Sequence, residues 1–563
     1  MNEADSSSNE KSGQSVPARI GWAALIVVTL AVCYFSNLGA IGFVGPDEPR
    51  YAWIARDMAE SGDWVTPRLY GKPWFEKPVL YYWMAAASFK LFGVSEAAAR
   101  LPSALCALFA TLSLAWLARR VYGEETARWL LLLLPTSVGM IGFSHAAATD
   151  MPFSGMLTIA MVCAAVGLGL VRNENTPVLP RTPWLALILF GFFLGLAVLA
   201  KGPAAIILTG GAVFFWALIT KRWRDAFRLF HPVAIVSLCA TALPWYILCA
   251  RRNPDFFRVF IIEHNFKRYL TPEFQHIQPF WYYVPVLSIA LLPWFAVALG
   301  TFAGWVLKKF TFSLRHATFY FLGWGLFCLV FFSTSKSKLP GYILPGFPAV
   351  MLLCSVAISS AQSILRKLIK IACAIAGLLF VAAGLFVAIS RRFPDKLMAF
   401  EPFAVVLLLA VGVANLLLAA ALQMRSKSVP HVTLTILSVA QILLLINGMN
   451  LVATRTEFFE TAPGGMASVL ARWGVPAASL RTLGLKRDTQ YALNFYLHRE
   501  IRDWRDDPIE DGYVLSNGLY CDQIDHGFNC EDLWGRIDFA SGAWALLRIT
   551  PRASAPAGSG QPR

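Results

Sequence analysis

Long apolar runs recur along this chain, separated by short polar connections. A run of about 20 apolar residues can cross a bilayer as a helix, and within lipid only helices and closed barrels satisfy all backbone hydrogen bonds. Hydrophobic residues make up 57% of the chain and charged residues only 15%, a balance typical of integral membrane proteins. The pattern therefore predicts a polytopic α-helical membrane protein.

We expect about thirteen spans of roughly 17–25 residues each, within 20–452. They begin near Ile20, Ala97, Arg128, Met151, Trp184, Pro203, Pro232, Tyr282, Ala317, Gly341, Leu368, Pro402 and Val432. The segment 1–19 is polar and lacks the pattern of a cleaved signal peptide, so we expect it to stay in the cytoplasm.

Basic residues gather in alternate connections, for example Lys221, Arg222, Arg224 and Arg228. Short loops rich in Lys and Arg face the cytoplasm. The arrangement predicts an N-terminus inside and, with an odd number of spans, a C-terminus outside. These loops explain most of the net charge of +15, so we expect no nucleic-acid partner.

The last segment, 453–563, changes in composition. Charged residues become frequent, and the alternating runs 513–515 and 544–549 predict strands. We expect a small periplasmic α/β domain here. Cys521 and Cys530 lie in this polar segment, whereas the other cysteines lie in or beside apolar spans. In an oxidising compartment we expect these two to form a disulfide.

The first apolar run is followed at once by Gly45-Pro46-Asp47-Glu48-Pro49-Arg50-Tyr51, and Phe75-Glu76-Lys77-Pro78 comes soon after. Charges where a helix leaves the membrane are costly enough to need a reason. The expected outer segment, 42–96, is also rich in Trp and Tyr, among them Tyr81 and Tyr82. Such a segment favours the membrane surface as short amphipathic helices.

The outer ends of later spans carry similar groups. They include Asp150, Lys201, Lys338 and Tyr342, and the outer segment before the eighth span holds His264. Lys and Arg bind phosphate, and carboxylates beside them can hold a cationic substrate or take a proton. The outer face therefore predicts a site for anionic lipids.

Simpler interpretations stay open for several of these residues. The lysines can snorkel to headgroups, Glu76–Lys77 can be a weak surface ion pair, and His264 can be an ordinary loop histidine. Glu76 with His264 is a candidate metal pair, with zinc as an adventitious ion, but two ligands make a weak signal. We expect no metal or other cofactor to be required.

The motifs together resemble the lipid-linked-sugar glycosyltransferases of the membrane GT-C fold, a group that includes the protein O-mannosyltransferases. Among these, the chain looks most similar to the bacterial 4-amino-4-deoxy-L-arabinose lipid A transferases. The likeness covers 20–452. The residues that carry it are Gly45–Tyr51, Phe75–Pro78, Thr149-Asp150, Lys201-Gly202-Pro203, Pro279–Tyr283 and Ser337–Tyr342.

The resemblance implies a monomeric enzyme of the bacterial inner membrane whose active site faces the periplasm. It would move aminoarabinose from undecaprenyl phosphate to a phosphate of lipid A, which would lower the negative charge of lipid A and give resistance to polymyxin and cationic peptides. An ionised phosphate acceptor needs positioning and charge stabilisation more than a strong base, and direct displacement would invert the anomeric carbon.

We assign Asp47 as the leading catalytic residue, with Asp150 as its partner at the sugar amine and Glu48 as a further catalytic candidate. The substrate-binding set is Arg50, Glu76, Lys77, Tyr81, Tyr82, Lys201, His264, Lys338 and Tyr342. The alternatives are a transferase of the same fold with another sugar or a protein acceptor, and a lipid flippase. Transporters usually place polar groups near the midplane and carry repeats, whereas here the charges gather at one face and no repeat is visible.

Overall fold

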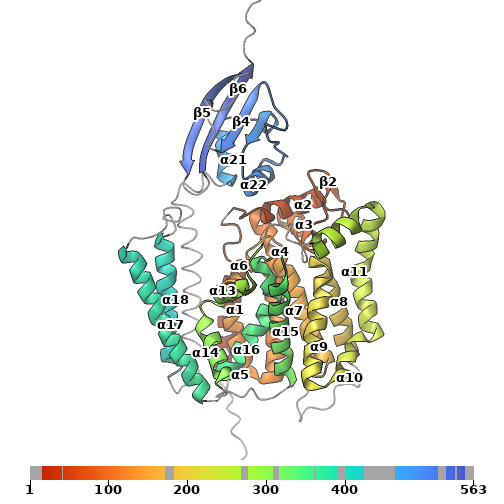
Figure 1. The fold of residues 1–563 in the computed structure, drawn as a ribbon, viewed down its shortest axis with the longest axis vertical. Helices are drawn as coiled ribbons and strands as arrows, with labels where there is room; N and C mark the ends of the chain where they lie inside the picture. The colour runs from red at the N-terminus through yellow and green to blue at the C-terminus, as the bar shows by residue number, and fades with distance from the viewer. Residues whose placement is uncertain are drawn as a thin grey trace, which may run out of the picture.

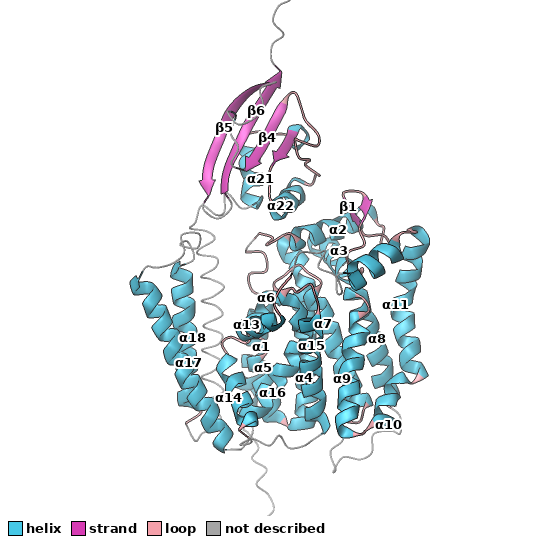
Figure 2. Cartoon of the chain, viewed as in Figure 1, coloured by secondary structure: helices cyan, strands magenta, loops and turns pink. Residues whose placement is uncertain are grey.

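A computed structural model describes 16–40, 42–171, 183–267, 277–307, 316–359, 363–390, 401–423, 463–517, 521, 528–538 and 542–551 of the 563 residues. Most of the chain forms a bundle of long helices, and a small domain with a β-sheet lies over one end of it (Figures 1 and 2). The helices that cap this end of the bundle come from the segment after the first long helix, α1 (Val16–Phe35).

The bundle follows the expected apolar runs. Its helices are α1, α4 (Glu96–Tyr122), α5 (Glu124–Leu133), α6 (Val138–Ser144), α7 (Asp150–Gly167), α8 (Trp184–Lys201), α9 (Ala204–Thr220), α11 (Pro232–Arg252), α13 (Tyr283–Ala290), α14 (Phe295–Val306), α15 (His316–Thr334), α16 (Phe347–Ser359), α17 (Ser363–Ser390) and α18 (Glu401–Ala421). Short helices α10 (Trp223–Ala226), η1 (Phe227–Phe230), η3 (Phe280–Tyr282) and η4 (Pro340–Gly346) lie in the connections.

Seven helices of the described residues are long and apolar enough to cross a membrane, or eight if α5 and α6, bent by 62°, form one span. Five further apolar helices are shorter. The first twelve expected spans each coincide with a helix or a broken pair of helices, and the thirteenth, near Val432, lies outside the described residues. The protein is thus polytopic and helical, while the count of thirteen stays a prediction.

Close helix packing uses small residues, as in other membrane bundles. At Gly191 on α8, an added Cβ would lie 2.2 Å from the carbonyl oxygen of Ala234 on α11. Only glycine permits this approach, which brings α8 against α11. The two helices form one wall of the bundle beside α9 (Figure 1).

The outer segment forms α2 (Asp47–Ser61), a two-stranded antiparallel turn of β1 (Arg68–Leu69) and β2 (Lys72–Pro73), and α3 (Leu80–Phe92). These elements cross the end of the bundle nearest the small domain, and the basic α10 connection lies at the other end (Figure 1). This agrees with the expectation that the acidic segment and the basic loop lie at opposite ends of the spans.

The small domain contains α21 (Pro463–Arg472), η6 (Ala477–Ser479), β3 (Leu480–Leu483), α22 (Arg487–Leu497), β4 (Gly512–Asn517), β5 (Phe528–Asp538) and β6 (Gly542–Pro551). The strand order is β3-β4-β6-β5, with β3 parallel to β4 and the other pairs antiparallel. Met466, Leu493, Leu515 and Leu546 lie in its core. The expected strands correspond to β4 and β6.

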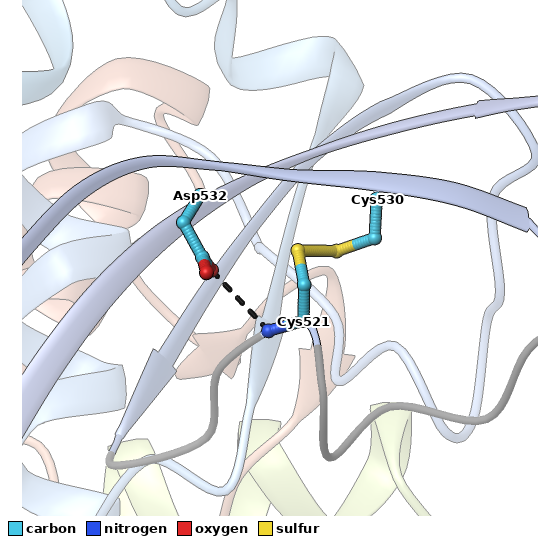
Figure 3. Close-up of a disulfide and its surroundings, with 3 residues drawn as sticks. All are labelled: Cys521, Cys530 and Asp532. Atoms are coloured by element: carbon cyan, nitrogen blue, oxygen red, sulfur yellow. Dashed lines mark hydrogen bonds between the residues drawn. A yellow bond between two sulfur atoms is a disulfide. The ribbon is translucent and has the colours of Figure 1, made fainter.

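Cys521 and Cys530 form a disulfide in this domain (Figure 3). The backbone N–H of Cys521 also donates to Asp532 Oδ1 at 3.2 Å. The bond ties the segment before β5 to the strand itself, at the edge of the sheet.

Candidate active site

Helix α2 begins at Asp47 and places Asp47 and Glu48 in its first turn. Carboxylates are favoured there because the unpaired N–H groups and the helix dipole create positive potential. The two neighbours nevertheless differ in exposure. The Asp47 side chain is 49% exposed and that of Glu48 only 7%. The sequence pair thus divides into one accessible and one buried carboxylate.

Glu48 is fully occupied by hydrogen bonds. Its Oε1 and Oε2 accept from Arg100 Nε at 3.0 Å and Nη2 at 2.8 Å. They also accept from the backbone N–H groups of Ala147 at 2.6 Å and Val44 at 2.7 Å. Through these bonds Glu48, on α2, connects α2 to Arg100 on α4 and to the loop between α6 and α7. The geometry argues against our assignment of Glu48 as catalytic and favours a positioning role.

Asp47, Arg50, Glu76 and Lys77 form a chain of alternating charges. Arg50 Nη2 lies 2.5 Å from Asp47 Oδ1 and 3.0 Å from Glu76 Oε2, and Lys77 Nζ lies 3.5 Å from Glu76 Oε1. Arg50 is only 4% exposed, and its guanidinium also lies over the ring of Trp74 at 5.5 Å. Its Nε has no hydrogen-bond partner among the described residues. Glu76 is therefore not part of a simple surface ion pair with Lys77, because it also contacts the buried Arg50.

Asp150 begins α7 and faces the end of α8, where Lys201 Nζ lies 2.5 Å from its Oδ1. Lys201 also lies 4.7 Å from the centre of the Tyr342 ring. Gly341 allows this cluster to form, because an added Cβ there would lie 2.6 Å from Asp150 Oδ1. Lys201 is held within the protein by these contacts, rather than reaching out to lipid headgroups.

Asp47, Glu48 and Asp150 line one cavity of about 500 Å³. Its wall also contains Phe143, Leu339 and several other apolar residues, so it has both polar and apolar surfaces. This combination suits an amphiphile whose polar group reaches the two aspartates. The structure thus brings together the two acidic residues that the sequence separates by a hundred positions.

Glu76 and His264 line a second cavity of about 540 Å³, together with Arg252, Asp255 and Arg258. His264 lies on η2 (Arg258–Lys267). Among the described residues no group of three or more His, Cys, Asp or Glu side chains could hold a metal ion. Glu76 already bridges two cations, so the Glu76–His264 pair offers a metal few donors.

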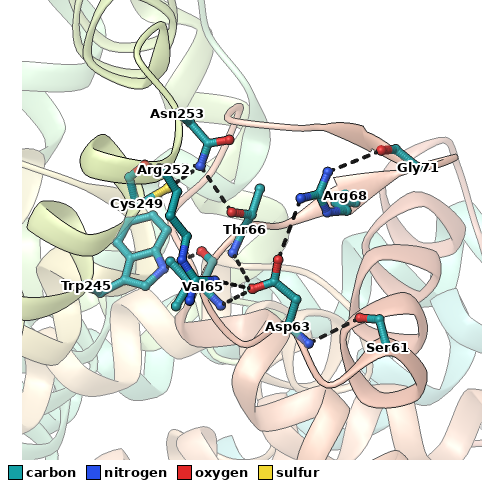
Figure 4. Close-up of polar contacts among 10 residues, drawn as sticks. All are labelled: Ser61, Asp63, Val65, Thr66, Arg68, Gly71, Trp245, Cys249, Arg252 and Asn253. Carbon is teal, nitrogen blue, oxygen red and sulfur yellow. Dashed lines mark hydrogen bonds and ion pairs between the residues drawn. The ribbon is translucent and has the colours of Figure 1, made fainter.

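The outer segment is fastened to the end of α11 beside this second cavity (Figure 4). Asp63 Oδ1 accepts from Arg252 Nη1 at 3.0 Å and from the N–H groups of Val65 and Thr66. Asn253 Nδ2 donates to Thr66 Oγ1 at 3.0 Å. Burial opposes ionisation of Asp63, but the hydrogen bonds from Val65 and Thr66 and the arginines outweigh it and lower its pKa.

Tyr81, Tyr82 and Lys338, which also belong to the assigned substrate-binding set, are buried. Tyr81 is buried and donates its hydroxyl to the Ala99 carbonyl at 3.0 Å. Lys338 Nζ donates to the carbonyls of Gln278 and Ser335. Both contacts are structural. Tyr82 is also buried, and its hydroxyl has no hydrogen-bond partner among the described residues.

Sequence reasoning missed Arg100, which organises the Glu48 carboxylate. The available signal was an arginine near the start of an apolar span, where a charge needs a partner. It also missed Tyr491, a residue of α22 whose ring lies 5.7 Å from the Arg50 guanidinium. No local pattern in the C-terminal segment marks that residue.

Comparison with known proteins places this architecture among membrane glycosyltransferases. The family profile described as dolichyl-phosphate-mannose-protein mannosyltransferase matches residues 22–260. The fold resembles the crystal structure of ArnT from Cupriavidus metallidurans bound to undecaprenyl phosphate, with a TM-score of 0.75 and 23% identity over 94% of this chain and 98% of that one. The apo form of the same protein gives a TM-score of 0.73.

Curated relatives named undecaprenyl phosphate-alpha-4-amino-4-deoxy-L-arabinose arabinosyl transferase are similar in sequence. The Edwardsiella ictaluri protein is 34% identical over 335 residues, which cover 59% of this chain and 58% of that protein, so the chain spans little more than half of this relative. The Yersinia enterocolitica protein is 31% identical over 384 residues, covering 68% of this chain and 67% of its own length. The chain therefore belongs to the family of undecaprenyl phosphate-alpha-4-amino-4-deoxy-L-arabinose arabinosyl transferases.

Proposed function

We propose that this protein transfers 4-amino-4-deoxy-L-arabinose from undecaprenyl phosphate to a phosphate of lipid A, at the periplasmic face of the inner membrane. The observation that carries the proposal is the cavity shared by Asp47 and Asp150 at the end of the bundle where the acidic segment lies. The names of the curated relatives supply the donor sugar and carrier. The resemblance to lipid A transferases supplies the acceptor.

The Asp150–Lys201 ion pair supports an aminosugar phosphate as the donor. Such a donor carries an ammonium group and a phosphate, so it can offer a new partner to each half of the pair. The ammonium would bind Asp150, and the phosphate would bind Lys201. A neutral sugar on the same carrier would leave Asp150 without a cation once Lys201 turned to the phosphate, and an unpaired charge in a partly buried site is costly.

The reaction needs one bond made and one broken. A lipid A phosphate oxygen attacks the anomeric carbon, and the bond from that carbon to the carrier phosphate breaks with its electron pair leaving on undecaprenyl phosphate. No proton has to move, because the acceptor is already ionised. Asp47 would stabilise positive charge that develops on the sugar as the bonds exchange. Attack opposite the leaving group inverts the anomeric configuration.

Arg50, Lys77 and Lys201 would hold phosphate oxygens, but each is paired with a carboxylate. Binding therefore involves an exchange of anionic partners and not the filling of an unpaired positive site. A ligand that also carries a cationic group is favoured, because that group can pair with the carboxylate released by the exchange. It also keeps the three side chains in place before the lipid arrives, which lowers the cost of ordering them.

The test is mass spectrometry of lipid A from cells with and without the gene for this chain. Lipid A should gain the mass of one pentosamine only when the active protein is present, and cells with the Asp47→Asn protein at equal abundance should lack the gain. An unmodified lipid A, with sugar found instead on periplasmic protein, would support the O-mannosyltransferase-like alternative. Export of unreacted carrier lipid would support a flippase.

A further inference from the structure

Helix α22 belongs to the small domain and also packs against the membrane part. Its Leu493 lies in the core of the small domain, whereas Phe495 is 4% exposed and lies in the core of the bundle and outer segment. Asn494, between them, is also buried and donates to the Tyr70 hydroxyl at 2.9 Å. The domain is therefore fastened to the outer segment by a continuous buried contact.

The contact also reaches two buried arginines, Arg100, which binds Glu48, and Arg50, which binds Asp47 and Glu76. Tyr496 accepts from the Phe43 N–H at 3.3 Å and donates to Glu96 at 2.7 Å. The Phe43 ring packs on Phe495 at 4.8 Å between centroids, and the Arg100 guanidinium lies 5.6 Å from the Phe43 ring. One turn earlier on α22, Tyr491 lies over Arg50.

Tyr491 adds a third aromatic ring beside the Arg50 guanidinium, from the small domain. The guanidinium has ring partners from the outer segment in Tyr51 and Trp74, at 5.2 and 5.5 Å, and the third ring, at 5.7 Å, comes from the other domain. Tyr491 is itself held by Arg487 Nε, which donates to its hydroxyl at 3.2 Å. Aromatic faces attract a guanidinium and restrict its rotation, more strongly when water is excluded.

We propose that the C-terminal domain is a working part of the substrate site, with Tyr491 as a positioning residue that fixes Arg50 for a lipid phosphate. This inference rests on the proposed function, because it takes the Arg50 ligand to be the carrier phosphate. The small domain would then help to bind substrate and not only stabilise the fold. The domain supplies a wall of the charged cluster, so the site is complete only when α22 is docked.

The experiment measures the affinity of purified full-length protein for undecaprenyl phosphate, with thermal unfolding recorded in parallel. Tyr491→Leu removes the aromatic face and should weaken binding by about three- to tenfold, with a rise in KM and little change in kcat. Tyr491→Phe keeps the face and should bind within about twofold of wild type. Tyr513→Leu is the matched control, because Tyr513 stacks on Arg548 at 4.8 Å within the same domain, away from the site. It should bind normally.

A double mutant separates positioning from general stability. If Tyr491 acts through Arg50, adding Tyr491→Leu to Arg50→Gln should weaken binding no further. Normal binding by Tyr491→Leu, an equal loss in Tyr513→Leu, or a further loss in the double mutant would each overturn the inference. A wild-type protein that does not bind undecaprenyl phosphate would overturn the proposed function, and this inference with it.

Discussion

Replacing Glu48 by Gln tests whether this carboxylate ties the structure together or takes part in chemistry. The side chain is buried and each of its oxygens accepts from two donors, one on Arg100 and one on the backbone. In Gln, one of these oxygens becomes an NH₂ group, which then faces two donors. The Arg100 guanidinium also loses the carboxylate that accepts from its Nε and Nη2, while it keeps its bonds to the carbonyls of Leu38 and Gly42.

The expected loss of folding stability is large for a substitution that exchanges one oxygen for an NH₂ group. Breaking a buried ion pair by removing one partner destabilises proteins by about 3–5 kcal/mol, because the other charge stays buried. We therefore expect Glu48→Gln to lower the thermal unfolding midpoint clearly and to reduce transfer through misplacement of α2. Glu124→Gln is the matched control, since Glu124 pairs with Arg128 at the surface with its side chain 55% exposed. That change should cost less than about 1 kcal/mol.

The assay is thermal unfolding of purified protein in detergent, followed by loss of the monodisperse peak in size-exclusion chromatography. Transfer to lipid A is measured on the same samples. A Glu48→Gln protein that unfolds at the wild-type temperature yet has lost transfer would refute the positioning role. It would return Glu48 to the catalytic set in which the sequence alone placed it.

Three further changes test the site and its surroundings. Asp47→Asn should reduce transfer by orders of magnitude while thermal unfolding and undecaprenyl phosphate binding stay near wild type; wild-type rates would overturn the assignment. Gly341→Ala should displace the Asp150 carboxylate and raise KM for the donor, and an unchanged KM would contradict the inference that this glycine is needed for the Asp150 position. Burial raises the pKa of Asp57 on α2, so its charge opposes folding at neutral pH. Asp57→Asn should therefore raise the unfolding midpoint at pH 7, and the gain should vanish below about pH 4, where both states of the wild type bind the proton; a gain that persisted in acid would contradict this origin.

The sequence by itself determined the helical membrane architecture. Apolar runs long enough to cross a bilayer must close their own backbone hydrogen bonds, so each becomes a helix wherever it lies. The same local logic located the acidic start of α2, the strands β4 and β6 of the small domain and the cysteine pair, but not β3 or β5. These features depend on neighbours a few residues apart, which a single sequence displays.

The tertiary structure decided which partner each of these charged residues has. Asp47 and Glu48 are adjacent in sequence and both line the cavity, yet Asp47 is half-exposed whereas Glu48 is buried and bonded to Arg100, 52 residues away. Likewise Lys201 faces Asp150, and Tyr491 reaches Arg50 from another domain. An ion pair forms between groups that helix packing brings within a few ångströms, and packing is set by the shapes of whole helices. No local pattern encodes that choice of partner, so only the folded chain could separate the half-exposed carboxylate of Asp47 from the buried one of Glu48.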